Sequence, residues 1–228
     1  KAIAHQYGAL LVFDELVTGF RWALGGAQEY FGITPDLGCF GKAVANGYPL
    51  SIICGKKKYM EKMDEVFVST TFNGFAPSLV AAIATIKIMR KTKNFHHSIH
   101  QLGEYFIEQA GKIAGQYQVP IQFAGYGPHP VMSIPIKDDY LSRVVKSFIY
   151  QEMNLAGILF SSSIGIAHAH KKFHLDYILK ILEQICQELT KFSDYKKLEK
   201  KLKGEVVAPR TIRHIPWLNP ELFKRHRG

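Results

Sequence analysis

The sequence is poor in cysteine. Its 228 residues contain three, Cys39, Cys54 and Cys186, and their spacing fits neither paired disulfides nor a zinc site. A small, odd number of thiols argues against a disulfide-stabilised secreted domain and favours a reducing compartment. We therefore expect a cytoplasmic protein with reduced cysteines.

Long apolar runs and a leader pattern are also missing. No segment approaches the ~18 consecutive apolar residues that would span a membrane. The first residues lack a basic start followed by an apolar stretch and a cleavage site. Neither export nor membrane association is expected. Hydrophobic residues make up 47% of the chain, enough for the core of one large or two small domains.

Acidic residues are outnumbered, with 19 Asp and Glu against 29 Lys and Arg, for a net charge of +10. Residues 191–228 hold eleven basic and four acidic residues, so they carry +7 of that charge (11 − 4). Such a segment can attract nucleic acid, an anionic surface or a phosphorylated substrate. However, Tyr195 and Trp217 are not interleaved for base stacking, and no nucleic-acid motif is present. A solvated basic tail is the favoured interpretation, and a polyanion-binding module is the alternative.

Two apolar runs, each followed by a chemically active side chain, are the informative features of the sequence. The run Ala9–Phe13 is short and unbroken, which is typical of a parallel strand covered on both faces, and Asp14 follows it. The weaker strand Leu37–Phe40 is followed by Gly41 and Lys42, 28 positions after Asp14 (42 − 14). Because ligands bind at the carboxyl ends of such strands, an acid and an amine are expected to share one site there. A lysine can form a Schiff base with an aldehyde, and a carboxylate can pair with a cationic ring nitrogen.

At these residues the sequence resembles class III aminotransferases, the pyridoxal 5′-phosphate enzymes, and in particular the glutamate-1-semialdehyde aminomutase group and its sugar-pathway relatives. The similarity runs from Phe13 through Gln28 and Thr34–Leu37 to Lys42, and the acid, the lysine and their interval all match. By this resemblance Lys42 holds the cofactor as a Schiff base and shuttles a proton. Asp14 keeps the pyridine nitrogen protonated, and Leu16 takes the place of a valine that packs on the ring.

A third segment, Ser69–Ser78, resembles the family's Thr-Phe-Gly-Gly-Glu stretch. The resemblance implies that Thr71, or the adjacent Thr70, reaches the cofactor phosphate of a neighbouring subunit, and hence a homodimer. Asn73 and Phe75 depart from the pattern, and Phe75 stands where the sugar-pathway relatives carry glutamate.

The resemblance also implies an α/β fold of pyridoxal-phosphate fold type I. Residues 1–94 would form part of the large cofactor-binding domain with a mostly parallel sheet, residues 95–192 a small α/β domain, and residues 193–228 a basic tail. The remaining apolar patterns predict strands at Leu50–Gly55, Val131–Ile136 and Gly157–Phe160, and helices at Pro77–Lys91, Ser98–Tyr117, Asp139–Leu155 and His174–Phe192. The first of these helices is apolar nearly all round and is expected to be buried.

No counterpart of the family's phosphate-binding loop, or of the aromatic residue that stacks on the pyridine ring, is found before Ala9. A fragment, a split gene product or one chain of a larger assembly is therefore expected, and its partner is either a second copy of the chain or a complementing amino-terminal half. The sequence does not tell whether that half is supplied in trans. The expected activity is amino transfer between a small-molecule donor and a carbonyl acceptor. The alternatives are intramolecular transfer, as in the aminomutase, and a non-catalytic fragment. The sequence names neither donor nor acceptor.

Histidines offer a competing interpretation. His96, His97 and His100 form one group, and His168, His170 and His174 another, but neither has carboxylates at a recognised ligand spacing. Surface or helix-capping histidines are favoured over a metal site.

Overall fold

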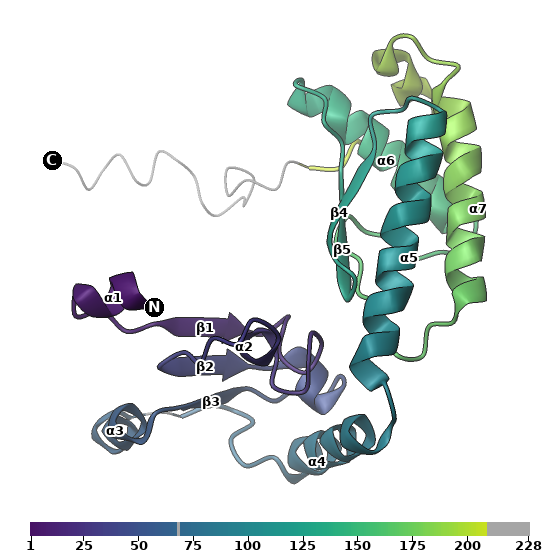
Figure 1. The fold of residues 1–228 in the computed structure, drawn as a ribbon. Coiled ribbons are helices and arrows are strands. Elements are labelled where there is room, and N and C mark those ends of the chain that lie inside the picture. Colours follow the sequence, from purple (N-terminus) through teal and green to yellow (C-terminus); the bar gives the residue numbers. More distant parts are fainter. Residues whose placement is uncertain (68, 209–228) are drawn as a thin grey trace, which may run out of the picture. The chain divides into compact units, whose positions relative to one another are not determined.

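The structure, a computed structural model, describes residues 1–67 and 69–208. The chain separates into two compact units, Lys1–Gln101 and Leu102–Gly228, and the long helix α5 (Phe95–Gln116) contributes to both (Figure 1). Each unit is described by itself. Within the described residues, no helix is long and apolar enough to cross a membrane.

The first unit contains a three-stranded sheet in the order β1-β2-β3, formed by β1 (Val12–Glu15), β2 (Leu37–Phe40) and β3 (Ile52–Gly55). Strands β1 and β2 are parallel, with Asp14 opposite Cys39 and Glu15 opposite Phe40. Strand β3 runs antiparallel to β2. The α/β fold is thus confirmed. Asp14 lies on the first strand of its parallel pair, and Lys42 follows the second strand.

The first strand differs from its prediction. It begins at Val12 rather than Ala9 and includes Asp14 and Glu15. The predicted burial on both faces is wrong, because Leu10 is 42% and Val12 50% exposed. The physical reason is that Val12 and Asp14 share one face of β1, which no described element covers, whereas Glu15 on the opposite face is buried.

Short helices and one long helix complete the first unit: α1 (Ala2–Gln6), α2 (Ala27–Tyr30), the 3-10 helix η1 (Lys42–Ala45), α3 (Lys57–Met60), the 3-10 helix η2 (Glu61–Glu65) and α4 (Ala76–Lys91). Helix α4 confirms the helix predicted from Pro77. Its predicted burial is wrong, since only Ser78 and Ala82 are buried, whereas Val80 and Ile83 are more than half exposed. The residues described here cover only the side of α4 that packs on η1.

Asp36 is a buried acidic residue directly before β2. Its fully buried carboxylate accepts hydrogen bonds from Lys56 Nζ (2.6 Å), the Leu11 amide (2.8 Å) and His5 Nε2 (2.7 Å). The bond from Lys56, then those from Leu11 and His5, hold the pKa of Asp36 well below its ordinary value of 3.8. One carboxylate thereby joins α1, β1 and the segment after β3.

A lowered carboxyl pKa predicts a stability that depends on acid. The contribution of Asp36 is fully present above its ordinary pKa and is lost as the pH falls toward its lower folded value, so the loss falls below about pH 4. We expect the urea midpoints of the wild-type chain and Asp36→Asn to differ most near neutral pH, and the gap between them to narrow progressively as the pH falls below about 4. A gap between the two midpoints that does not change with pH would contradict this origin.

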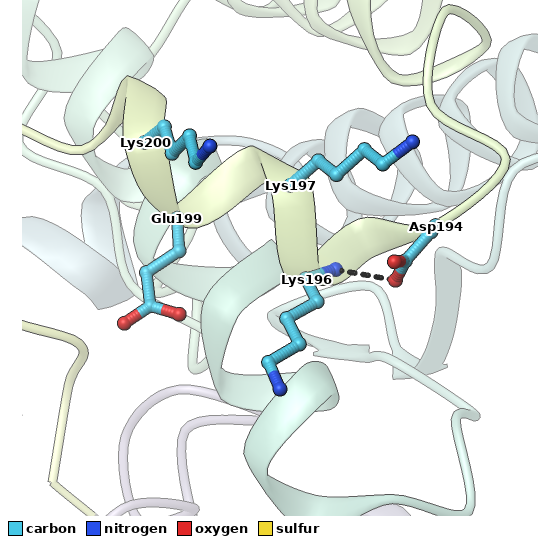
Figure 2. A pocket seen from close by; sticks show the side chains of 5 residues that line it. All are labelled: Asp194, Lys196, Lys197, Glu199 and Lys200. Carbon is cyan, nitrogen blue, oxygen red and sulfur yellow. Dashed lines mark hydrogen bonds between the residues drawn. The ribbon is translucent and has the colours of Figure 1, made fainter.

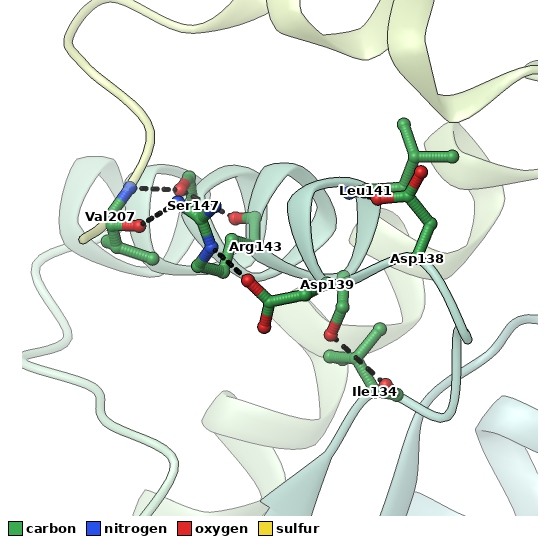
Figure 3. Close-up of polar contacts among 8 residues, drawn as sticks. Ile134, Asp138, Asp139, Leu141, Arg143, Ser147 and Val207 are labelled. Carbon is green, nitrogen blue, oxygen red and sulfur yellow. Dashed lines mark hydrogen bonds and ion pairs between the residues drawn. The ribbon is translucent and has the colours of Figure 1, made fainter. Parts of the chain in front are cut away.

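The second unit packs helices against a hairpin formed by β4 (Gln122–Tyr126) and β5 (His129–Ser133). Helices α6 (Asp139–Leu155) and α7 (Lys172–Leu189) have strongly one-sided apolar patterns, and their buried positions recur every three to four residues. Leu175, Leu179, Leu182, Ile185 and Leu189 form the buried stripe of α7. The helix boundaries of α6 match the prediction, because Asp138 caps its first turn by accepting a hydrogen bond from the Leu141 amide (Figure 3).

Strand β4 has no counterpart among the predicted strands, and one predicted strand is wrong. The strand predicted at Gly157–Phe160 is absent, because the Ile158 amide donates back to the Met153 carbonyl at the end of α6 (2.9 Å) instead of to a neighbouring strand. Gly157, with φ +77°, makes the reversal that places it there.

The basic segment after α7 is not simply solvated, as the sequence had suggested. Residues Tyr195–Lys201 form the 3-10 helix η3, which packs on α6 with Leu198 completely buried. Further along, the Val207 amide donates to Ser147 Oγ (2.9 Å) and its carbonyl accepts from Arg143 (3.1 Å), as Figure 3 shows. The solvated-tail interpretation is therefore wrong up to Val207. Residues 209–228, including Trp217, lie outside the described residues.

Candidate active site

The structure brings Asp14 and Lys42 to the carboxyl ends of neighbouring parallel strands. Asp14 is the second-to-last residue of β1, opposite Cys39, and Lys42 follows β2 by two residues. Parallel pairing alone explains this arrangement, because both strands end at the same edge of the sheet. Asp14 differs from its prediction only in lying within the strand rather than after it.

Asp14 presents an exposed carboxylate. Its Oδ1 accepts a hydrogen bond from the Leu16 amide two residues on (3.0 Å), which orients the side chain at the end of the strand. No residue in the described part of the chain donates to Oδ2. One oxygen is thus held by the backbone, and the other is open to a donor such as a protonated ring nitrogen.

Lys42 presents an exposed amine. Among residues 1–67 and 69–208, no side chain forms a hydrogen bond or ion pair with its Nζ. Its backbone adopts the left-handed conformation, with φ +49°, at the start of η1. Left-handed backbone disfavours long side chains, so the surrounding structure must hold this residue in place.

Leu16 supports the turn that carries the lysine. A Cβ atom placed on Gly41 would lie 2.8 Å from Leu16 Cδ2, so the two residues are in close contact and the glycine leaves room for leucine. Leu16 is half-buried. An apolar side chain is therefore present between Asp14 and the Lys42 turn, where the predicted ring contact would lie.

Thr71 is not brought into this group by any described contact. It lies on an exposed turn before α4, and its hydroxyl makes no hydrogen bond with residues that the structure describes. The same holds for Thr70. Their predicted role across a subunit interface stays a prediction.

Glu15 is a residue whose role the sequence did not reveal. It is fully buried, and its carboxylate accepts hydrogen bonds from the amides of Ala27 and Gln28 (2.8 Å each) and from the Thr18 hydroxyl. Glu15 therefore fixes the loop that runs from β1 to α2. The amides of Ala27 and Gln28 lie 12 and 13 residues after Glu15 in the sequence, so no local sequence motif predicts these hydrogen bonds.

Two histidines of the first group form hydrogen bonds with backbone carbonyls. His96 Nε2 donates to the Phe20 carbonyl (3.2 Å), and His100 Nε2 donates to the Trp22 carbonyl (2.8 Å). His100 also stacks on Tyr30, with the ring centroids 5.1 Å apart. Burial lowers the pKa of His96. In the described residues, no three metal-ligating side chains converge on one point.

A hollow on η3 lies in the basic segment for which polyanion binding was the alternative interpretation. It is lined by Asp194, Lys196, Lys197, Glu199 and Lys200 (Figure 2). The lysine amines point in different directions, and two carboxylates lie among them. Since the positive charge is dispersed and partly neutralised, the hollow lacks the convergent cations of a phosphate site.

An amine and a carboxylate oxygen that no residue in the described part of the chain binds thus lie at one edge of the sheet, an arrangement that could accept an aldehyde cofactor. Comparison with known proteins gives the family. Residues 1–167 match the family model described as aminotransferase class-III, and the chain belongs to that family. Class III aminotransferases transfer amino groups with pyridoxal 5′-phosphate, so both the reaction class and the cofactor agree with those expected from the sequence.

Individual relatives support the assignment. The chain is 31% identical over 201 residues to a 3-aminobutyryl-CoA aminotransferase of Cloacimonas acidaminovorans, with 84% of this chain and 47% of the relative covered. It is 30% identical over 202 residues to a glutamate-1-semialdehyde 2,1-aminomutase of Fusobacterium nucleatum, with 82% and 46% covered. The chain thus spans about half the length of these relatives.

A solved structure shows the same fold. The crystal structure of an omega-transaminase from Sphaerobacter thermophilus superposes with a TM-score of 0.75 at 20% identity, covering 84% of this chain and 47% of the transaminase. At this identity, the likeness establishes the fold alone.

Proposed function

We propose that this chain forms the lysine-bearing portion of a pyridoxal-phosphate-dependent aminotransferase that moves an amino group from a small-molecule donor to an aldehyde or keto acceptor. The observation that carries the proposal is that the Lys42 amine and the Asp14 Oδ2 atom, neither of which binds another described residue, lie at the carboxyl ends of the parallel strands β2 and β1. When bound, the cofactor supplies an aldehyde for amine exchange and a cationic ring that withdraws electrons.

Each residue has a distinct part in this proposal. Lys42 Nζ would hold the cofactor as a Schiff base and, once the amine of the donor has displaced it from that bond, would carry a proton to and from the reacting substrate carbon. Asp14 Oδ2 would accept a hydrogen bond from the protonated ring nitrogen, while Oδ1 keeps its bond to the Leu16 amide. Leu16 would pack on the ring. The exposure of Lys42 and Asp14 fits these contacts, because neither Lys42 Nζ nor Asp14 Oδ2 must give up a hydrogen bond to a described residue.

Intramolecular amino transfer is the second candidate function, and the similarity to a glutamate-1-semialdehyde aminomutase favours it. The two reactions differ in their need for a separate acceptor. A transaminase requires two substrates, whereas an aminomutase turns over a single one.

The assembly follows from the same proposal. Thr71 contributes its hydroxyl to the cofactor phosphate of a neighbouring subunit, which requires a homodimer. Residues 1–94 belong to the large domain, 95–192 to the small domain, and 193–228 form a basic extension. An amino-terminal half completes the large domain. A cytoplasmic location agrees with the three free cysteines in the described residues.

The test is to identify the lysine that reacts. The purified chain is incubated with pyridoxal 5′-phosphate, reduced with borohydride and digested, and the modified lysine is located by mass spectrometry. We expect modification to concentrate on Lys42, with little on exposed lysines such as Lys57. Equal modification of both lysines would refute a specific site.

A further inference from the structure

A phenylalanine lies against the turn that carries Lys42. Phe20 belongs to the loop after β1, and its ring forms an edge-to-face pair with Phe40, with the centroids 5.7 Å apart. Phe20 also packs on the small buried cluster of Val44, Ala45 and Ala82. Phe40 comes two residues before Lys42, whereas Val44 and Ala45 follow it. One side chain therefore packs both on Phe40, before the lysine, and on the cluster that includes Val44 and Ala45, after it.

The backbone of Phe20 is held in an unfavourable conformation. Its φ of +60° is left-handed, which is rare for a bulky side chain and persists only where the surroundings impose it. Lys42 has the same feature, with φ +49°. Two left-handed residues other than glycine thus occur in segments that pack on each other.

Neighbouring residues impose this conformation. The Gly19 amide donates to the Glu15 carbonyl (2.8 Å), and a Cβ on Gly19 would lie 2.5 Å from Phe40 Cδ1. Only glycine allows the loop to approach Phe40 this closely. On the other side, His96 at the start of α5 donates to the Phe20 carbonyl (3.2 Å). The loop is thus fixed both to β1 and to α5.

We propose that Phe20 is a positioning residue that holds the Lys42 turn, residues 41–46, in the conformation that presents the lysine amine. The inference rests on the proposed role of Lys42 but concerns a different residue. Phe20 acts through Phe40, Val44 and Ala45 and touches no reacting group. His96 acts in turn by holding the carbonyl of Phe20.

The decisive measurement is amide hydrogen exchange of the chain without cofactor. In Phe20→Leu, which keeps an apolar side chain but removes the ring, we expect exchange in residues 41–46 to quicken about tenfold, while β3 is unaffected. Phe31→Leu, at an exposed phenylalanine of the same unit, is the matched control and should leave exchange in residues 41–46 unchanged.

Chemical modification provides a second readout. The rate at which pyridoxal 5′-phosphate and borohydride modify Lys42 should fall about tenfold in Phe20→Leu, whereas modification of Lys57 stays constant. If the wild-type chain shows no preference for Lys42, the proposed function fails, but hydrogen exchange still decides the role of Phe20. Unchanged exchange in residues 41–46, or an equal increase throughout the first unit, would overturn the inference.

Substitutions at His96 and His97 test the same inference in case Phe20→Leu fails to fold. His96→Ala removes the donor to the Phe20 carbonyl and is expected to quicken exchange in residues 41–46 in the same way. His97→Ala, at the adjacent exposed position of α5, should not. His96→Gln retains a side-chain N–H and is expected to restore slow exchange, a rescue that loss of packing alone would not give.

Discussion

Replacing Glu15 by alanine is expected to destabilise the first unit by about 2–6 kcal/mol, because two backbone amides each lose their hydrogen bond to a buried carboxylate, at about 1–3 kcal/mol each. This is a large share of the ~5–15 kcal/mol that holds a typical domain together. The amides belong to Ala27 and Gln28, whose hydrogen bonds to the carboxylate close the loop after β1. Denaturant unfolding followed by circular dichroism measures the change.

Glutamine at the same position separates the two carboxylate oxygens. Oε2 accepts from Ala27 and from the Thr18 hydroxyl, whereas Oε1 accepts from Gln28 alone. Glu15→Gln can keep an oxygen at the Oε2 position, but it places an NH₂ group opposite the Gln28 amide. We therefore expect it to lose less stability than Glu15→Ala.

Glu29→Ala is the matched control within the same loop. Glu29 also accepts a backbone hydrogen bond, from the Gly25 amide, but it is exposed to water. Its loss should cost no more than about 0.5–1.5 kcal/mol, since water replaces the acceptor. Equal effects of the Glu15 and Glu29 variants would show that the burial of Glu15 is unimportant.

The arrangement of Asp14 and Lys42 was predictable because it depends on one local pattern used twice. A short apolar run followed by a polar residue predicts a strand and its functional end, and parallel pairing places both ends at one edge. The helices α6 and α7 were predictable for a similar reason. Their apolar positions recur with the period of a helix, and Asp138 marks the start of α6.

The supports of the site could not be read from the sequence. Glu15 bonds to residues 12 and 13 positions away, and Phe20 contacts Phe40 across 20 positions (40 − 20). Such contacts depend on the path of a loop, which periodicity does not describe. Left-handed backbone at Phe20 and Lys42 is equally hidden, because neither residue type favours it.

Errors in predicted burial have a single physical cause. Apolar composition in Ala9–Phe13 and in α4 shows that these segments favour burial, but not which partner buries them. Among the described residues, β1 has a neighbour on one side and α4 packs on one face. The sequence therefore correctly indicated that these segments are apolar, but it could not indicate which elements pack on them. The same distinction applies to Leu198, whose burial against α6 a charge count could not reveal.

Replacing Lys42 by glycine is expected to abolish the specific modification by pyridoxal 5′-phosphate without weakening the fold. The amine that reacts is removed, so the loss should be complete. The folded chain should not suffer, because the side chain is exposed and has no described partner. Mass spectrometry after borohydride reduction measures the first effect, and denaturant unfolding the second.

The backbone of Lys42 makes this prediction specific. At φ +49°, a residue other than glycine is strained by about 1–2 kcal/mol, whereas glycine loses about 0.5–1 kcal/mol more chain entropy on folding. The balance predicts that Lys42→Gly is as stable as the wild-type chain, or more stable by up to about 1.5 kcal/mol. Lys42→Ala loses the amine but keeps the strain, so it should be less stable than Lys42→Gly.

Asn46→Gly provides the control for the backbone alone. Asn46 ends the same turn with φ +47°, and it carries no amine. Because asparagine tolerates left-handed backbone better than lysine, the gain from glycine should be smaller than at Lys42, and modification of Lys42 should persist. A Lys42→Gly chain less stable than Lys42→Ala would contradict the argument from strain. If the prediction holds, the fold tolerates an unfavourable residue at position 42 for the sake of its amine, as expected where function rather than stability determines the side chain.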